Sequence, residues 1–133
     1  MTFEDAMASL GDELGLPLET VGQATGFEVA FGSGSLEPMP VSITAAGDGR
    51  SAVFSADLGE LPDEGLDELL MRMLEANHLF EGTGGAALSV EDGCARLERR
   101  VGLDEIGRSG GTDAVRSFLC MVGHWADVIA GRV

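Results

Sequence analysis

The chain has 133 residues, of which 44% are hydrophobic and 23% charged; this size and composition suit one domain with one hydrophobic core. Its 23 acidic residues face only 8 basic ones, so the formal net charge is −15, and every basic residue is Arg. A field of this sign repels phosphate backbones and anionic lipid surfaces, which excludes nucleic acid and membrane surfaces from the expected partners.

The N-terminus and the cysteines indicate a cytoplasmic protein. Glu4 and Asp5 stand where a signal peptide would carry basic residues. No apolar run approaches the ~20 residues that a membrane-spanning helix requires. Cys94 and Cys120 are too few for a disulfide framework or a metal cluster, so we expect a reducing compartment.

The first half of the chain carries one helical pattern followed by three alternating patterns. Phe3, Met7, Leu10 and Leu14 recur at helical spacing, with Thr2 at the N-cap position. Alternation of apolar and polar residues then predicts three strands, at Phe27–Phe31, Val41–Ala45 and Ala52–Leu58. Because a Gly-Asp-Gly loop joins the last two strands, we expect an antiparallel meander.

A second helix is predicted to start at Pro62 and Asp63 and to end at Asn77. Its apolar positions follow helical spacing and are Leu66, Leu69, Leu70, Met73 and Leu74. With Met71 they fill an arc of about 200°, roughly twice what a helix covering one core needs. We therefore expect two apolar faces, which are buried either against a second subunit or between the sheet and the last helix of the same subunit.

The last part of the chain predicts two more strands and a helix. Ala86–Val90 and Cys94–Val101 are joined by a hairpin loop, and Thr112 caps a helix whose apolar side runs from Val115 to Ile129. The predicted order is α-β-β-β-α-β-β-α in a single domain of residues 1–133. This is an α+β fold with a twisted antiparallel sheet packed by helices.

This order, the chain length and the acidity together resemble the class I type III secretion chaperones, the family of the Tir and Yop effector chaperones. The most specific similarity is the segment Leu69–Asn77, which resembles the leucine-rich second helix of that family, ending in Ala-Asn. Phe3 and Leu10 in the opening helix, the glycine-rich turn at 82–85 and Trp125 in the closing helix are similarly placed. The resemblance spans nearly the whole chain.

The resemblance implies a homodimer that binds the N-terminal chaperone-binding segment of a secreted effector and keeps it soluble and export-competent. It also implies a bacterial cytoplasmic protein without a cofactor. The dimer contact falls on the second helix and the hairpin after it, at Leu66, Leu69, Leu70, Met73, Leu74, Asn77 and Leu88. The effector falls on the first helix and the exposed sheet, at Phe3, Met7, Leu10, Phe27, Val29 and Phe31.

The expected sheet edge and the net charge support the same function independently of the resemblance. A domain of this size leaves part of its first strand unpaired, and such an edge can accept a strand from another chain while flanking pockets receive alternate side chains. The negative charge keeps exposed apolar patches in solution and steers the protein toward basic cargo segments.

Other interpretations stay open. A protein of the same fold could regulate a protein partner without secretion. Cys120 and His124, four residues apart on the last predicted helix, could serve a small hydrolase as nucleophile and base, or could ligate a metal. A free Cys is usually buried and inert, so we expect no catalytic and no metal-binding residues. Phe3, Phe27 and Phe31 could each belong to the core instead of a binding surface.

Overall fold

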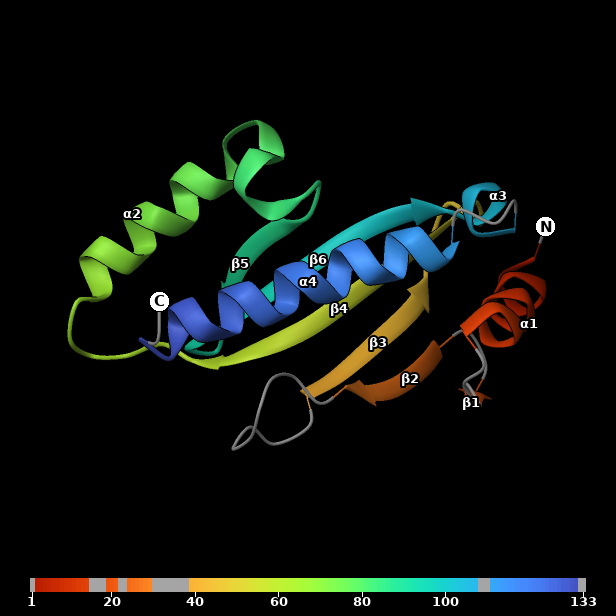
Figure 1. Cartoon of the computed structure of the whole chain (residues 1–133), viewed down its shortest axis with the longest axis horizontal. Helices are drawn as coiled ribbons and strands as arrows, with labels where there is room; N and C mark the ends of the chain where they lie inside the picture. The colour runs from red at the N-terminus through yellow and green to blue at the C-terminus, as the bar shows by residue number, and fades with distance from the viewer. Residues whose placement is uncertain (1, 15–18, 22–23, 30–38, 108–110, 132–133) are drawn as a thin grey trace.

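A computed structural model of the chain describes residues 2–14, 19–21, 24–29, 39–107 and 111–131 (Figure 1). The helical elements are α1 (Phe3–Leu14), α2 (Leu66–Asn77), the 3-10 segment η1 (His78–Thr83), α3 (Leu103–Glu105) and α4 (Gly111–Ile129). The strands are β1 (Glu19–Val21), β2 (Ala24–Val29), β3 (Met39–Ala45), β4 (Ser51–Glu60), β5 (Ala87–Glu91) and β6 (Cys94–Gly102).

The strands form one six-stranded antiparallel sheet in the order β1-β2-β3-β4-β6-β5. The cross-strand partners Val41, Ala56, Leu97 and Leu88 form one row across four strands, and all four are buried. Because side chains alternate between the two faces of a strand, this row defines the inner face of the sheet. The predicted meander and the α+β fold class are confirmed.

Helix α4 covers the inner face of the sheet, lying along β4 and β6 (Figure 1). The rings of Phe54 on β4 and Phe118 on α4 meet edge to face with their centroids 5.7 Å apart, a favoured aromatic geometry. The predicted apolar side of this helix is fully buried, at Val115, Phe118, Val122, Trp125 and Ile129. The main core therefore lies between α4 and the sheet.

Helix α1 lies at the α3 end of the sheet (Figure 1). The Thr2 hydroxyl accepts a hydrogen bond of 3.1 Å from the Asp5 backbone N–H, which confirms the predicted N-cap. Leu10 is fully buried, and a side chain at Gly111 would come within 3.1 Å of it. The first helix is therefore docked closely onto the start of α4.

Several predicted boundaries are wrong. Helix α2 begins at Leu66, not at Pro62, because Gly65 precedes it in the left-handed region with φ 71°. The sequence pattern also missed the short elements β1, η1 and α3. The first predicted strand begins three residues earlier than expected and spans Ala24–Val29. Phe31, its predicted last residue, lies outside the described residues.

Candidate partner-binding surface

Helix α2 buries only one of its two apolar faces in the subunit. Leu69, Met73 and Ala76 are buried, and this face packs toward β5 and η1. Met71 and Leu74 lie on another face of the helix and are 57% and 65% exposed. The interpretation that one subunit buries both faces is therefore wrong for these two residues.

Three more large apolar side chains are exposed close to this helix, on η1 and β5. Within the described residues, the exposed large apolar side chains are Met71, Leu74, Leu79, Phe80 and Val90, between 47% and 73% exposed. We call these five residues the apolar patch. All of them belong to three elements that contact one another. A contiguous exposed apolar patch on a folded protein commonly marks an interaction site.

The backbone of η1 holds two patch residues in an unfavourable conformation. Leu79 and Phe80 have φ angles of 55° and 57°, in the left-handed region that costs a bulky L-residue of order 1–2 kcal/mol. Such a conformation persists only where the surrounding structure fixes it. The strain therefore indicates that the outward position of these two side chains is imposed by the fold.

Hydrogen bonds around η1 supply that constraint. The Phe80 carbonyl accepts bonds from the Gly85 N–H at 3.2 Å and from the Thr83 hydroxyl at 3.3 Å. The indole Nε1 of Trp125 donates to the Gly82 carbonyl at 3.0 Å. Any side chain at Gly82 would come within 2.8 Å of Ala76, so this close approach requires glycine.

The outer edge of β5 is closed by side chains from α2 and η1. Asn77 Nδ2 donates to the Leu88 carbonyl at 2.8 Å, and its Oδ1 accepts from the Leu88 N–H at 2.7 Å. The Ala86 N–H donates to the Thr83 carbonyl at 3.3 Å, and the Thr83 hydroxyl donates to the Ala86 carbonyl. Because both residues already have both backbone groups bonded, this edge is not open to strand addition there.

The predicted dimer residues divide by burial. Leu69, Met73 and Leu88 are buried inside the subunit, whereas Leu66, Leu70 and Asn77 are half-buried and Leu74 is exposed. The prediction for the helix as a whole remains untested. Leu79, Phe80 and Val90 were not among the predicted contact residues, although an apolar pair directly after the helix, before a glycine-rich turn, was an available signal.

The predicted effector-binding residues on α1 belong to the core of the subunit. Phe3, Met7 and Leu10 are all buried. Phe27 and Val29 lie on β2, opposite Val41 and Met39 of β3, and Phe31 lies outside the described residues. Contact between these residues and an effector stays a prediction.

Strand β2 has one edge that is only partly paired within the described residues. Strand β1 pairs with Ala24–Gly26, whereas Phe27–Val29 pair with β3 alone in this part of the chain. A strand in this position presents backbone groups to a partner. Whether this edge is free in the whole chain stays a prediction, because residues 15–18, which directly precede β1, lie outside the described residues.

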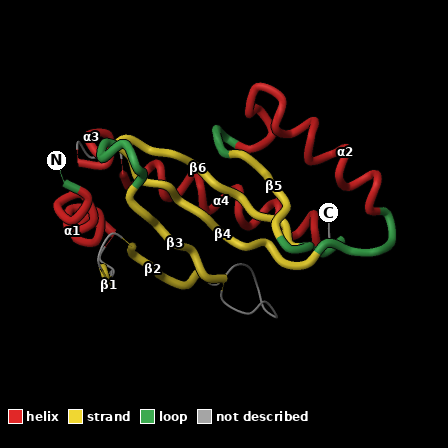
Figure 2. Tube along the Cα trace, turned by 180° about the vertical axis from the view of Figure 1, so that it is seen from behind, coloured by secondary structure: helices red, strands yellow, loops and turns green. Residues whose placement is uncertain are grey.

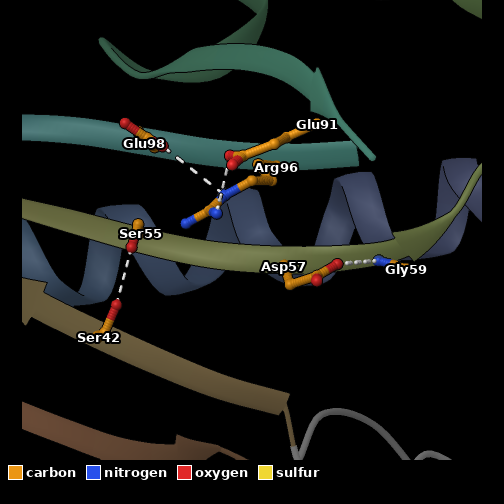
Figure 3. Close-up of polar contacts among 7 residues, drawn as sticks. All are labelled: Ser42, Ser55, Asp57, Gly59, Glu91, Arg96 and Glu98. Carbon is orange, nitrogen blue, oxygen red and sulfur yellow. Dashed lines mark hydrogen bonds and ion pairs between the residues drawn. The ribbon is translucent and has the colours of Figure 1, made fainter. Parts of the chain in front are cut away.

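The outer face of the sheet is polar. Figure 2 views this face and shows β3, β4 and β6 in front of α4. The hydroxyls of Ser42 and Ser55 are hydrogen-bonded at 2.8 Å, and Arg96 forms ion pairs with Glu91 at 3.1 Å and Glu98 at 3.7 Å (Figure 3). The apolar patch, not this face, is where large exposed apolar side chains gather in the described structure.

The two residues of the hydrolase interpretation lie on the surface of α4. Cys120 and His124 are both exposed, and the His124 ring packs edge to face on Trp125 at 5.5 Å. Nowhere in the described ranges do three or more His, Cys, Asp or Glu side chains form a group that could hold a metal ion. None of the described helices combines the length and the apolar character that crossing a bilayer demands.

The family model of the Tir chaperone protein (CesT) family matches residues 7–125. The chain belongs to this family. The sequence-based prediction of a type III secretion effector chaperone is thereby confirmed at family level, and the family is one of chaperones rather than of enzymes. No curated protein matches the chain.

Three solved structures share the fold of this Tir chaperone family member. A chain in the HopA1–SchA chaperone–effector complex has a TM-score of 0.65 and 10% identity over 96% of this chain and 91% of its own. A chain in the ExsC–ExsE complex has a TM-score of 0.65 and 12% identity over 94% and 91%. A chain in the heterodimeric ExoU–SpcU complex from the type III secretion system of Pseudomonas aeruginosa has a TM-score of 0.62 and 16% identity over 95% of both chains.

Proposed function

We propose that this type III secretion chaperone holds the N-terminal segment of an effector in extended form and keeps it soluble until export. Family membership across most of the chain is the observation that carries the proposal. The similar chains come from complexes described as chaperone–effector, or as part of a type III secretion system. The protein works in the bacterial cytoplasm, with no cofactor and no catalytic residues.

The stretch Phe27–Val29 of β2, which pairs with β3 alone among the described residues, is the best candidate for the strand that accepts the effector. Phe27–Val29 have a strand neighbour on one side only within the described residues, whereas the opposite edge of the sheet is closed at Ala86 and Leu88. Strand addition obtains affinity from backbone hydrogen bonds and specificity from pockets for alternate side chains. The net charge of −15 favours a basic effector segment.

The apolar patch is the best candidate for the homodimer contact. Its residues follow one another along α2, η1 and β5, so two copies related by a twofold axis can bury them together. Phe80 and Leu79 are held outward by a constrained backbone, which lowers the entropy cost of ordering them at an interface. This contact does not use β2, so it leaves Phe27–Val29 to the cargo.

Co-expression with neighbouring reading frames, followed by affinity capture of the tagged chain, tests the function. We expect recovery of a secreted protein, with limited proteolysis protecting an N-terminal segment of that protein. Recovery of a partner that is not exported would favour the regulator without secretion. Cys120→Ala distinguishes a chaperone from a hydrolase. A chaperone with this change keeps its cargo, whereas a hydrolase that uses this thiol loses turnover.

A further inference from the structure

A cavity of about 420 Å³ lies between the start of α2 and the end of α4. Figure 1 shows these two helix ends at the same end of the molecule. Leu69, Val128 and Ile129 are among its lining residues, and each is buried by at least nine-tenths of its surface. Pro62, two residues after the end of β4, also lines the cavity. The floor of the cavity is therefore aliphatic.

The rim of the cavity is acidic. Among the described residues, the charged side chains that line it are Glu64, Glu68 and Arg72, and all three are exposed. Helix α4 ends here, and the carbonyl groups at a helix C-terminus add partial negative charge. In the described part of the lining, negative charge therefore outweighs positive charge around an aliphatic floor.

We propose that this cavity binds an apolar side chain that is followed or preceded by a basic residue in a segment of a partner protein. The aliphatic floor removes the apolar side chain from water, while the basic neighbour pairs with the carboxylates of Glu64 and Glu68. An acidic segment is repelled by the same carboxylates. The occupant is therefore a basic, amphipathic segment.

This site is separate from the two surfaces of the proposed function. Leu69 and Glu68 lie on the side of α2 that turns toward α4, whereas Met71 and Leu74 carry the apolar patch. Strand β2 does not line the cavity. Side-chain docking here would add a second anchor for a partner, and it does not require strand addition or dimerisation.

Nuclear magnetic resonance of the ¹⁵N-labelled full chain tests the site with two synthetic probes. One probe is a capped hexapeptide that alternates leucine with arginine, and the other alternates leucine with glutamate. We expect the arginine peptide to shift the amide signals of Leu69 and of Val128–Gly131, and the glutamate peptide to leave them unchanged. Equal shifts from both peptides, or shifts confined to Phe27–Val29 or to the apolar patch, would overturn the proposal.

Charge-neutral variants separate this site from general attraction to an acidic protein. Glu64→Gln with Glu68→Gln should weaken arginine-peptide binding about three- to tenfold, because exposed ion pairs each contribute modestly. The matched control is Asp67→Asn with Glu75→Gln, which removes the same charge from a neighbouring groove on the outer side of α2. If the control weakens binding as much as the test pair, the attraction is not specific to the cavity and the proposal fails.

Discussion

Asn77 and Leu88 are joined by two hydrogen bonds that turn the end of α2 into a cap for the sheet edge. The side-chain amide donates to the Leu88 carbonyl at 2.8 Å and accepts from the Leu88 N–H at 2.7 Å. An amide matches a backbone peptide group in having one donor and one acceptor side by side. Asn77 therefore stands in for a neighbouring strand at this position and blocks edge-to-edge association.

Replacing Asn77 with Ala should open this edge. Two hydrogen bonds to a half-buried site are lost, so we expect the free energy of unfolding to fall by about 1–3 kcal/mol. The Leu88 amide should also lose protection in hydrogen exchange. Glu75→Gln, an exposed change on the same helix, serves as the control and should leave that amide protected. An unchanged Leu88 exchange rate would show that the amide cap is not formed in solution.

Asn77→Asp tests the same geometry with pH. The ionised carboxylate places an acceptor against the Leu88 carbonyl, so at neutral pH this variant should be less stable than Asn77→Ala. As the pH falls through the carboxyl pKa, the protonated acid can donate to that carbonyl, and the difference between the two variants should shrink. Urea unfolding of both variants, at neutral pH and at a pH below the carboxyl pKa, measures this difference in the free energy of unfolding. A gap that is constant with pH would contradict the donor role of the side chain.

Leu74→Asp and Leu79→Asp should separate the proposed dimer. Both side chains are exposed in the subunit, so each subunit keeps its fold, but the interface would have to bury an unpaired charge. Light scattering should change from the dimer mass to the monomer mass. Met73→Asp is a poor test because Met73 is buried inside the subunit.

The control for the dimer experiment is Ala87→Asp. Ala87 is exposed on β5 and belongs to the opposite face of that strand from Leu88 and Val90. This variant should remain dimeric. A wild-type chain that is monomeric at all concentrations would remove the case for a dimer through the apolar patch.

Leu10→Ala should destabilise the free chain by about 2–5 kcal/mol, because it removes most of a fully buried side chain and leaves a cavity in its place. Thermal unfolding without cargo measures the loss. Asp12→Ala, an exposed change on the same helix, should stay within about ±0.5 kcal/mol. If Leu10→Ala melts like the wild type, α1 is not docked in solution and its apolar face is available to an effector.

The regular elements could be predicted because their side-chain periods reflect burial on one face. Val41 and Ile43 alternate with Ser42 and Thr44, and both lie buried on the inner face of the sheet. The apolar spacing of α4 was equally informative, from Val115 to Ile129. The excess width of α2 correctly indicated apolar surface that one subunit does not bury, which Met71 and Leu74 confirm.

The remaining features depend on contacts between distant parts of the chain. Leu79 and Phe80 adopt positive φ in a turn whose Gly82 carbonyl accepts a hydrogen bond from Trp125, far away in sequence. No local pattern encodes that bond. The role of Asn77 was also hidden, because a side-chain amide at the end of a helix has many possible partners and the structure selects the Leu88 backbone.

Cys94 should be a slow nucleophile. Burial raises the pKa of its thiol above the ordinary value, and the negative charges of Asp57, Glu60 and Asp92 raise that pKa further. At a given pH less thiolate is present, so alkylation by iodoacetamide should be slower than for a free cysteine. The midpoint of the alkylation rate against pH should also lie at a higher pH. The Cys120→Ala chain leaves Cys94 as the single thiol for this measurement.

Glu60→Gln removes one of the charges and should lower the midpoint, whereas the Glu98→Gln control on the same strand as Cys94 should not move it. A midpoint at or below that of the free thiol would mean that the acidic residues around this end of β6 do not act on Cys94 in solution.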